Sequence, residues 1–489
     1  MFSGSILPRL FLLCCSITSL LAIPSASYCA ETENKTPSVY SASPEVRLTV
    51  IPPSPITDQI VLDVRGGFDN AAEESTAWQA ELYFDKIDSD RLLQKAEGTV
   101  APKSCAGVYF RCPAAGRAGR HDLILTLKMN GGVQCASTTI EILPSPIRSV
   151  RKIDGAWSGI VHWSEQEGKR WNPEIRKMKD GDWRELMRAM NEIEMNIVVI
   201  EETLRHQEYH GKHQIEKNGY KGLAFYPSQL YPGRMEMAAK DPIDAILSEA
   251  DMRGMFVFLG VGMYAWFDFT PASLEWHKRT AEELWQRYGH HSSFYGWYIS
   301  EEAAGSLAPF SSNKPEDVQR YREEIVQFFK GFREYVQRFA PEKPIMLAPN
   351  CHSMKSGEKT WCELLKYCDI VCPFGFHRMP ENDVSGEEAA QWLQTLCDEA
   401  GAHLWMDMEV FLFGPENDLY PRPIDGLVSD LVRFPNFEKI LCFQYPGLMN
   451  AQWASLKPGG PDTVKLYEDY KKYLDEQWLP QHQLTETKP

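Results

Sequence analysis

Between Val150 and Leu479 the chain alternates eight times between a short apolar run and a helical pattern, and this alternation constrains its fold most. Eight strand–helix units over about 330 residues are typical of a (β/α)8 barrel. A doubly wound open sheet is the competing architecture, but it would place a Gly-rich phosphate turn after an early strand, and the sequence has none there. We therefore predict a (β/α)8 TIM barrel over residues 150–480, preceded by an all-β sandwich. The predicted barrel strands are Gly155–His162, Asn196–Glu201, Met255–Val261, Tyr295–Glu301, Pro344–Pro349, Asp369–Phe374, His403–Glu409 and Lys439–Tyr445.

The intervening segments carry helical signals. Glu316–Phe339 repeats apolar residues with a period close to 3.6, and Asp462–Leu474 is expected to form the last helix. Pro242 suits the first turn of a helix that Gly254 would end.

Residues 45–146 show a different pattern, with short alternating runs between turn signals. Asn130-Gly-Gly132 predicts a hairpin between the last two runs. Such spacing is typical of a β-sandwich, and we predict an immunoglobulin-like domain. It lacks a clear aromatic stripe, which favours a structural role over a ligand site of its own. The predicted strands are Val46–Ile51, Gln59–Val64, Ala80–Phe84, Val108–Phe110, Leu123–Leu127 and Thr138–Ile142.

Residues 1–30 have the pattern of a secretory signal peptide, with Arg9 before an apolar region and small residues after Pro24. We expect a secreted or periplasmic protein. Cys29 lacks the small, apolar context of a lipid-modified cysteine, which disfavours lipoprotein anchoring. No later apolar run is long enough to span a bilayer, so no membrane span is expected after the signal is removed.

The composition narrows the possible partners. A formal net charge of −16 disfavours a phosphate-binding surface, so no nucleic-acid partner is expected. Fourteen Trp and twenty Tyr supply aromatic faces of the kind on which sugar rings stack, although aromatic residues also fill cores.

The twelve cysteines do not identify a site. No CxxC pair is present, which leaves a Cys-based zinc or redox centre without support. In an oxidising compartment some could pair, for instance among Cys105, Cys112 and Cys135, with a connectivity that the sequence leaves open. Cys368, Cys372 and Cys442 lie in apolar runs and are expected to be small buried hydrophobes.

Two predicted strands end on carboxylic acids. Tyr295–Glu301 leads directly into Glu302, and His403–Glu409 ends on Glu409 after Asp407. Buried strands do not end in acids for stability, because removing an unpaired charge from water is costly. A pair of carboxyl groups is what glycoside hydrolysis requires, one to protonate the leaving oxygen and the other to attack or to activate water.

The spacing of these acids suits a shared site. Glu302 and Glu409 are 409 − 302 = 107 positions apart, about three strand–helix units, so strands four and seven would present them across the barrel mouth. We predict both as catalytic and expect the other polar and aromatic strand-end residues to bind substrate: Glu301, His162, Trp163, Glu201, Tyr264, Trp266, Asn350, His377 and Tyr445. Glu301 and nearby aromatic residues would raise the pKa of Glu302, and hydrogen bonds from Tyr445 or His377 would keep Glu409 ionised.

Two alternatives compete with this hypothesis. A metal-dependent barrel hydrolase would show His-x-His after strand one, where the chain has only His162-Trp-Ser, so we predict neither a metal nor another cofactor. A non-catalytic carbohydrate-binding or scaffold protein on the same barrel would bind sugar without turnover.

The Gly296-Trp-Tyr-Ile-Ser-Glu-Glu302 segment resembles an uncharacterised family of secreted bacterial glycosidase-like barrels, and acids ending strands four and seven resemble the clan A glycoside hydrolases. This resemblance covers roughly Val150 to Leu479. It implies a glycoside hydrolase with Glu302 as general acid/base and Glu409 as nucleophile. Clan A enzymes usually have an Asn before the acid that contacts the sugar 2-hydroxyl, and this chain has Glu301. The sugar, the linkage, retention or inversion, endo or exo action, the oligomeric state and the effect of Glu301 stay open.

Overall fold

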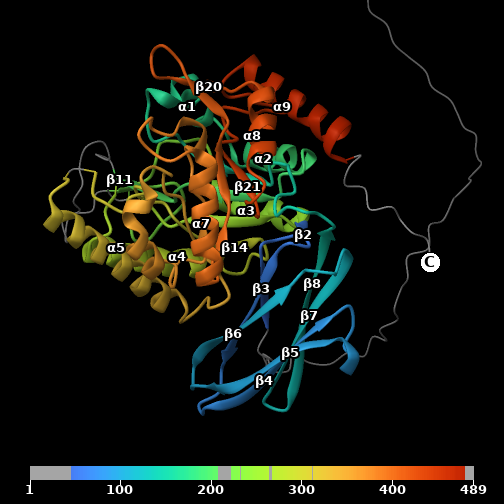
Figure 1. The fold of residues 1–489 in the computed structure, drawn as a ribbon. Helices are drawn as coiled ribbons and strands as arrows, with labels where there is room; N and C mark the ends of the chain where they lie inside the picture. Colours follow the sequence, from blue (N-terminus) through green and yellow to red (C-terminus); the bar gives the residue numbers. More distant parts are fainter. Residues whose placement is uncertain (1–45, 207–221, 232, 264–266, 311, 480–489) are drawn as a thin grey trace, which may run out of the picture. The chain divides into compact units, whose positions relative to one another are not determined.

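Eight parallel strands close into a barrel, which confirms the predicted fold class (Figure 1). In ring order they are β9 (Gly155–Ser158), β10 (Ile197–Ile200), β13 (Phe256–Gly260), β14 (Phe294–Ile299), β15 (Ile345–Leu347), β16 (Ile370–Val371), β17 (His403–Leu404) continued by β18 (Met406–Glu409), and β21 (Ile440–Phe443). The predicted seventh strand is divided at Trp405: β17 pairs with β16, and β18 pairs with β21. Because β21 pairs in turn with β9, the ring is complete.

The computed structural model describes residues 46–206, 222–231, 233–263, 267–310 and 312–479. Residues 43–489 form one unit that contains both the barrel and the strands before it. The predicted signal peptide lies outside the described residues. Within the described part of the chain, none of the helices combines the length and the apolar character needed to span a bilayer.

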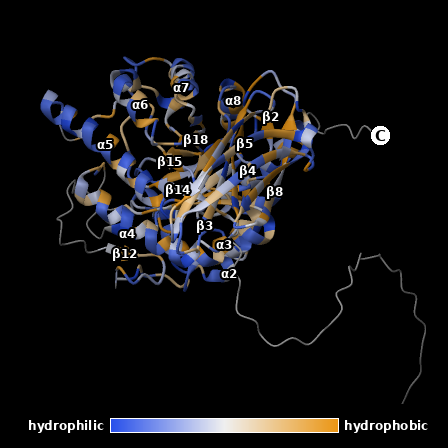
Figure 2. Ribbon diagram, turned by 90° about the horizontal axis from the view of Figure 1, so that it is seen from below, coloured by the Kyte–Doolittle hydropathy of each residue, from blue (hydrophilic) through white to orange (hydrophobic). Residues whose placement is uncertain are grey.

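Helices surround the barrel and begin and end where the sequence signals them. Pro242 is the first residue of its helix, Asp241 accepts a hydrogen bond from the Asp244 N–H, and Gly254 ends the helix at φ +63°. The helices are α1 (Asn172–Ile175), α2 (Asp180–Glu192), α3 (Pro242–Arg253), α4 (Pro271–Tyr288), α5 (Pro315–Val336), α6 (Glu358–Leu364), α7 (Gly386–Ala400), α8 (Ile424–Arg433) and α9 (Pro461–Tyr473). Figure 2 shows the hydrophilic colour on much of α4 and α5 and the hydrophobic colour along inner strands such as β15.

Two sheets precede the barrel. A three-stranded sheet has the order β1-β3-β6, and a five-stranded sheet has the order β2-β8-β7-β4-β5. Their strands are β1 (Arg47–Ile51), β2 (Ile56–Thr57), β3 (Val61–Asn70), β4 (Thr76–Phe84), β5 (Leu92–Val100), β6 (Ser104–Pro113), β7 (Gly119–Met129) and β8 (Gly132–Leu143). The predicted hairpin is confirmed, since Asn130 and Gly131 both have positive φ between paired Met129 and Gly132. The sequence prediction omitted β5, an edge strand whose polar residues give no continuous apolar signal.

Shorter elements decorate the barrel and the sheets. They are the pairs β11 (Leu204–His206) with β12 (Gly222–Ala224) and β19 (Phe411–Phe413) with β20 (Leu419–Pro421), the turns of 3₁₀ helix η1 (Ser89–Arg91), η2 (Glu167–Arg170), η3 (Met354–Gly357) and η4 (Phe376–Arg378), and the π-helical turn η5 (Leu474–Trp478). The loops after β9, β10 and β18 therefore contain structure of their own.

The barrel interior is a packed core rather than a channel. Side chains such as Trp157, Val199, Phe258 and Trp405 form one buried cluster inside the ring. Ile51, at the end of β1, joins this cluster and is fully buried. The Tyr295 hydroxyl, near the start of β14, donates to the Val50 carbonyl at 2.6 Å. The three-stranded sheet therefore meets the barrel at the N-terminal ends of its strands.

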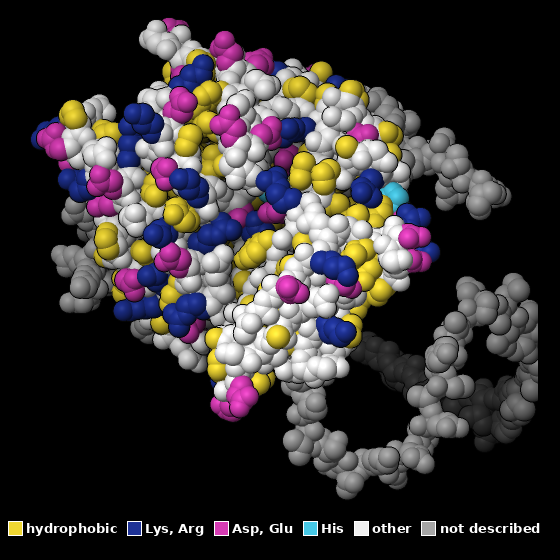
Figure 3. All heavy atoms as spheres, turned by 60° about the horizontal axis from the view of Figure 1, so that its bottom comes forward, with side chains coloured by type: hydrophobic (Ala, Val, Ile, Leu, Met, Phe, Trp, Pro, Cys, Tyr) yellow, Lys and Arg dark blue, Asp and Glu magenta, His cyan; other side chains and the backbone are white. Residues whose placement is uncertain are grey.

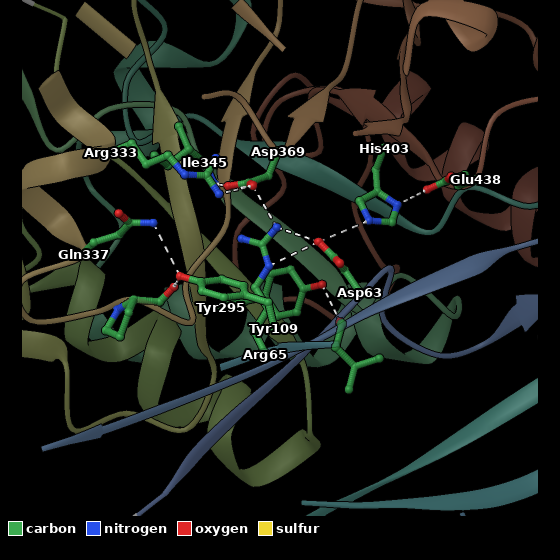
Figure 4. A network of polar contacts seen from close by, with 12 residues as sticks. Asp63, Arg65, Tyr109, Tyr295, Arg333, Gln337, Ile345, Asp369, His403 and Glu438 are labelled. Atoms are coloured by element: carbon green, nitrogen blue, oxygen red, sulfur yellow. Dashed lines mark hydrogen bonds and ion pairs between the residues drawn. The ribbon is translucent and has the colours of Figure 1, made fainter. Parts of the chain in front are cut away.

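A charge-balanced network joins β3 to this end of the barrel (Figure 4). Arg65 on β3 donates to Asp63 at 2.6 Å and to Asp369 at 2.7 Å, and Arg333 of α5 also donates to Asp369 at 2.9 Å. Burial alone would raise the pKa of Asp369, but the two guanidinium groups outweigh it and hold that pKa well below its ordinary value. His403 contacts Glu438 at 2.7 Å beside this pair. The network supplies specific polar contacts between the sandwich and the barrel.

Three buried cysteines match an expectation from the sequence. Cys368, Cys372 and Cys442 are fully buried, as predicted, and the nine cysteines within the described ranges are all free thiols, including Cys105, Cys112 and Cys135. On the face shown in Figure 3 acidic and basic side chains are interspersed rather than gathered by sign.

Candidate active site

A cavity of about 250 Å³ lies at the C-terminal ends of the barrel strands. Its position is the one at which working residues of this fold gather. The residues that line it are Trp157, Trp163, Glu167, Glu201, Met263, Tyr298, Ser300, Glu302, Ala348, Phe374, Arg378, Asp407, Glu409, Phe411, Phe413, Leu419 and Phe443. Five of these described residues carry carboxyl groups, whereas Arg378 is the one cationic side chain among them.

Glu302 and Glu409 both line this cavity. Glu302 follows β14, which ends at Ile299, and Glu409 is the last residue of β18. The two acids that the sequence places 107 positions apart therefore meet in one site. Glu302 is half-buried, whereas Glu409 is only 3% exposed.

Glu409 is held as a carboxylate by two side chains from the segment after β16. Arg378 donates from Nε to Oε1 at 2.8 Å and from a terminal nitrogen to the same oxygen at 2.6 Å. His377 Nδ1 lies 3.0 Å from Oε2. Burial would raise the pKa of Glu409, but the hydrogen bonds from His377 and Arg378 outweigh it and lower that pKa.

Two other carboxyl groups in the cavity have raised pKa values. Burial is the main cause that raises the pKa of Glu201 to about 7, with Glu167 adding to the rise and Arg205 opposing it. Burial also raises the pKa of Asp407 well above its ordinary value, reinforced by the charges of Glu409 and Glu201. Acids with raised and lowered pKa values therefore share one site, an arrangement that separates proton donors from ionised groups.

Glu167 completes the acidic set from η2, the helical turn after β9. Burial, followed by the charge of Glu302, raises the pKa of Glu167 to about 7. His162 Nε2 lies 3.7 Å from a Glu167 carboxyl oxygen. Burial lowers the pKa of this histidine to about 3, so it is neutral at physiological pH and adds no charge to the site.

Gly159 gives Glu201 the space that it occupies. A Cβ atom built on Gly159 would lie 2.7 Å from Glu201 Oε2 and 2.4 Å from Gln444 Oε1. Both distances are shorter than a side-chain carbon tolerates, and Gln444 is fully buried. The absence of a side chain at the end of β9 is therefore what lets Glu201 and Gln444 approach each other.

Aromatic side chains form much of the cavity wall. Trp157 meets Tyr298 edge to face, with ring centroids 5.6 Å apart, and both line the cavity. Trp163, Phe374 and Phe443 add further rings. A pocket that combines aromatic faces with carboxyl groups suits a ligand with both C–H surfaces and hydroxyl groups.

Among the described residues, the predicted substrate-binding side chains fall into two groups. Trp163 and Glu201 line the cavity, and His377 contacts Glu409. Glu301, His162, Asn350 and Tyr445 do not line it. Tyr264 and Trp266 lie outside the described residues.

Each of the four residues outside the cavity wall has a local reason for its place. Glu301 is fully buried, and its charge contributes to the raised pKa of Tyr321 on α5. His162 contacts the Ser164 backbone at 3.1 Å, and Asn350 Oδ1 accepts from the Gly305 N–H at 3.0 Å. Tyr445 lines a separate small cavity beside α2, so the expected hydrogen bond to Glu409 comes from His377 and not from Tyr445.

The sequence prediction omitted Glu167, Tyr298, Arg378 and Asp407 from the site. Asp407 and Glu409 alternate on one strand, so their shared side could have been inferred from period-two spacing. Arg378 also follows a predicted strand. Glu167 had no such signal, because it lies on a helical turn inside a loop.

No metal centre is evident in the described ranges, where no three His, Cys, Asp or Glu side chains are arranged to hold an ion. A comparison with curated proteins found no match.

Several solved structures are similar in fold. A Bacteroides thetaiotaomicron protein provisionally named an alpha-L-fucosidase is 18% identical with a TM-score of 0.47, covering 68% of this chain and 98% of that one.

Two larger enzymes are also similar. Bacteroides uniformis beta-glucuronidase 2 is 12% identical with a TM-score of 0.39, and the match covers 88% of this chain but 50% of that one. A GH2 beta-galacturonidase from Eisenbergiella tayi is 11% identical with a TM-score of 0.38, covering 88% of this chain and 72% of that one. The chain thus spans about half the length of the beta-glucuronidase, and these identities carry no activity over to it.

A family model matches residues 153–454, which is more than half of the chain and includes all the barrel strands. The chain belongs to the family described as a domain of unknown function, DUF4434.

Proposed function

We propose that this protein is a glycoside hydrolase that cleaves O-glycosidic bonds of a poly- or oligosaccharide with a pair of carboxyl groups. Glu302 is the general acid/base, and Glu409 is the nucleophile or the carboxylate that stabilises the positive charge of the transition state. The proposal rests above all on one observation: both strand-end acids line the same cavity at the barrel mouth.

The electrostatics support different roles for the carboxyl groups. Glu409 is kept ionised by Arg378 and His377, as a group that faces an oxocarbenium-like centre must be. Glu302 is less buried and lies near enough to Glu167 to raise the pKa of that residue. Protonated and ionised acids on the same cavity wall are the arrangement that acid catalysis requires near neutral pH.

The cavity size supports a small occupant. About 250 Å³ lies below the roughly 300–1,000 Å³ of pockets that hold drug-sized ligands. One sugar residue in the cavity, with the rest of the substrate outside, would put its glycosidic bond near the mouth, where Glu302 can protonate the leaving oxygen.

The test is release of reducing ends from a panel of plant, microbial and host glycans, followed by chromatography of the products. We expect one glycan class to be cleaved by the native protein and the rate to fall at least about 100-fold in Glu302→Gln and in Glu409→Gln. Equal rates in native protein and both variants would reject the assigned roles.

One observation favours a second candidate, a carbohydrate-binding protein without turnover. Arg378 and His377 occupy both oxygens of Glu409, which leaves a nucleophile less free to attack. This candidate predicts saturable sugar binding that persists in Glu302→Gln while no product forms with any glycan.

We also propose that the protein is exported, on the basis of the signal-like residues 1–30. Mass spectrometry of the protein expressed from its full gene tests this: loss of about 30 N-terminal residues is expected, and an intact N-terminus would contradict export by cleavage.

A further inference from the structure

Two buried carboxyl oxygens in the cavity have no hydrogen-bond partner within the described protein. They are Glu201 Oε2 and Asp407 Oδ1. Glu201 is 5% exposed and Asp407 is 4% exposed, and both residues line the cavity. Buried polar atoms are almost always satisfied, so two such oxygens on one cavity wall indicate positions at which a ligand supplies the missing contacts.

The protonation of these two groups indicates what the contacts are. Burial raises both pKa values, to about 7 for Glu201 and well above the ordinary value for Asp407. A raised pKa favours the protonated form of a carboxyl group, and in that form the group can both donate and accept a hydrogen bond. A hydroxyl group is its natural partner, because a hydroxyl also does both.

The cavity offers little to a negatively charged ligand. Arg378 is the one cationic side chain among the described lining residues, and its charge is balanced by Glu409 through contacts at 2.8 and 2.6 Å. The remaining acidic residues of the lining, Glu167, Glu201, Glu302 and Asp407, give a ligand carboxylate no positive partner. A carboxylate that enters a partly buried site without a cation to pair with loses its hydration uncompensated, which is unfavourable.

We propose that the cavity selects a neutral sugar without a carboxylate and binds its hydroxyl groups through Glu201 and Asp407. The inference rests on the proposal that this cavity takes a sugar, and it specifies the class of sugar. A uronic acid is excluded by charge.

Matched monosaccharides test this selection directly. Binding to the native protein is followed at pH 7 by calorimetry and by the fluorescence of the cavity tryptophans. The sugars are glucose, galactose, mannose and fucose, with the uronic acid counterpart of each of the first three. We expect at least one neutral sugar to bind about tenfold or more tightly than its uronate.

The outcomes separate this inference from the proposed function. Equal or tighter binding of a uronate would overturn the selection while leaving hydrolysis possible. Binding of no sugar at all would also overturn it. Neutral-sugar binding without cleavage of any glycan would overturn the hydrolase proposal and leave the selection in place.

Variants locate the contacts. Asp407→Asn keeps the shape and the hydrogen-bonding capacity of a neutral acid, so the neutral-sugar affinity should change by less than about threefold, whereas Asp407→Leu should lose about tenfold or more. Asp251→Asn alters an acid that contacts His291 outside the cavity and serves as the matched control, with no expected change. Equal affinities in native protein and Asp407→Leu would contradict the assigned contact.

Discussion

The two ends of the barrel both contain clusters of carboxyl groups, but the clusters have opposite character. At the N-terminal end Asp63 and Asp369 are matched by Arg65 and Arg333. At the C-terminal end five carboxyl groups share one cavity with Arg378 as the cation among the described lining residues. In the charge-balanced cluster each carboxylate has a cationic partner within the protein, and the contacts join two parts of the fold. In the acid-rich cluster some carboxyl groups lack a partner within the described protein, and a substrate can supply it.

The pKa values express the same difference. Asp369 has a lowered pKa because its two guanidinium partners outweigh its burial. Glu201 and Asp407 have raised pKa values because burial is not offset. Glu409 is the exception at the C-terminal end, because Arg378 and His377, both on the short segment η4, contact its carboxylate and lower its pKa. A carboxyl group with a shifted pKa therefore indicates a functional site only when the direction of the pKa shift and the residues that cause it are considered together.

The largest expected effect concerns the two acids that we propose as catalytic. Glu302→Gln and Glu409→Gln should each reduce kcat/KM by at least about 100-fold, and the double variant should be little worse than the poorer single one, because the two residues act as a unit. Kinetics on the identified glycan measure this, with urea unfolding as the control for folding. Multiplicative losses in the double variant would indicate independent roles and break the proposed pair.

The next effect concerns stability at the opposite end. Asp369→Asn should lower the free energy of unfolding by about 3–5 kcal/mol, because it leaves buried guanidinium groups without their carboxylate. Urea unfolding measures the change, and the affinity of the cavity for sugar should stay the same. Glu387→Gln, which breaks the exposed pair with Arg433, is the matched control and should cost less than about 1 kcal/mol. A loss below 1 kcal/mol in Asp369→Asn would mean that the network does not stabilise the fold.

The carboxyl groups at the two ends of the barrel should also change the folding stability in different pH ranges. The pKa of Glu201 rises on folding from 4.5 to about 7, so the native state binds more protons between these values and stability falls as the pH increases through this range. Asp369 has a lowered pKa, so its contribution is present above 3.8 and is lost as the pH falls below that value.

Unfolding free energies measured from pH 3 to pH 8 test this contrast. Glu201→Gln should flatten the decline between about pH 4.5 and 7 by on the order of 1–3 kcal/mol and leave the acid side unchanged. A decline of equal size in Glu201→Gln would assign the effect to other groups.

The smallest effect concerns the space around Glu201. Gly159→Ala places a Cβ where Glu201 Oε2 and Gln444 Oε1 approach, so Glu201 must move. We expect sugar affinity to fall by about tenfold, or 1.4 kcal/mol. Gly181→Ala on α2 is the matched control, because a Cβ there meets no atom within 4 Å, and it should have no effect on affinity. Unchanged affinity in Gly159→Ala would remove Glu201 from the binding wall.

The fold and the positions of Glu302 and Glu409 could be predicted from the sequence, because the barrel topology fixes where the strands end. The positions of side chains in the loops after the strands could not. Glu301 and Glu302 are adjacent after β14, and only the path of the loop decides that Glu302 lines the cavity while Glu301 is buried away from it. Tyr445, two residues beyond β21, turns toward α2 for the same reason.

Contacts between residues far apart in the chain also could not be predicted from the sequence. Arg65 and Asp369 are 304 positions apart, and neither has a local signal that names the other. Glu167 joins the site from a helical turn that no periodicity revealed. These residues depend on tertiary packing, which a single sequence does not encode in any short pattern.

The most direct test of the paired-acid site is a crystal structure of Glu302→Gln with its oligosaccharide bound. We predict one neutral sugar residue inside the cavity, its anomeric carbon facing Glu409, its glycosidic oxygen within hydrogen-bond distance of residue 302, and hydroxyl groups on Glu201 and Asp407. A sugar bound elsewhere on the barrel, or one whose glycosidic bond lies out of reach of both acids, would contradict the account.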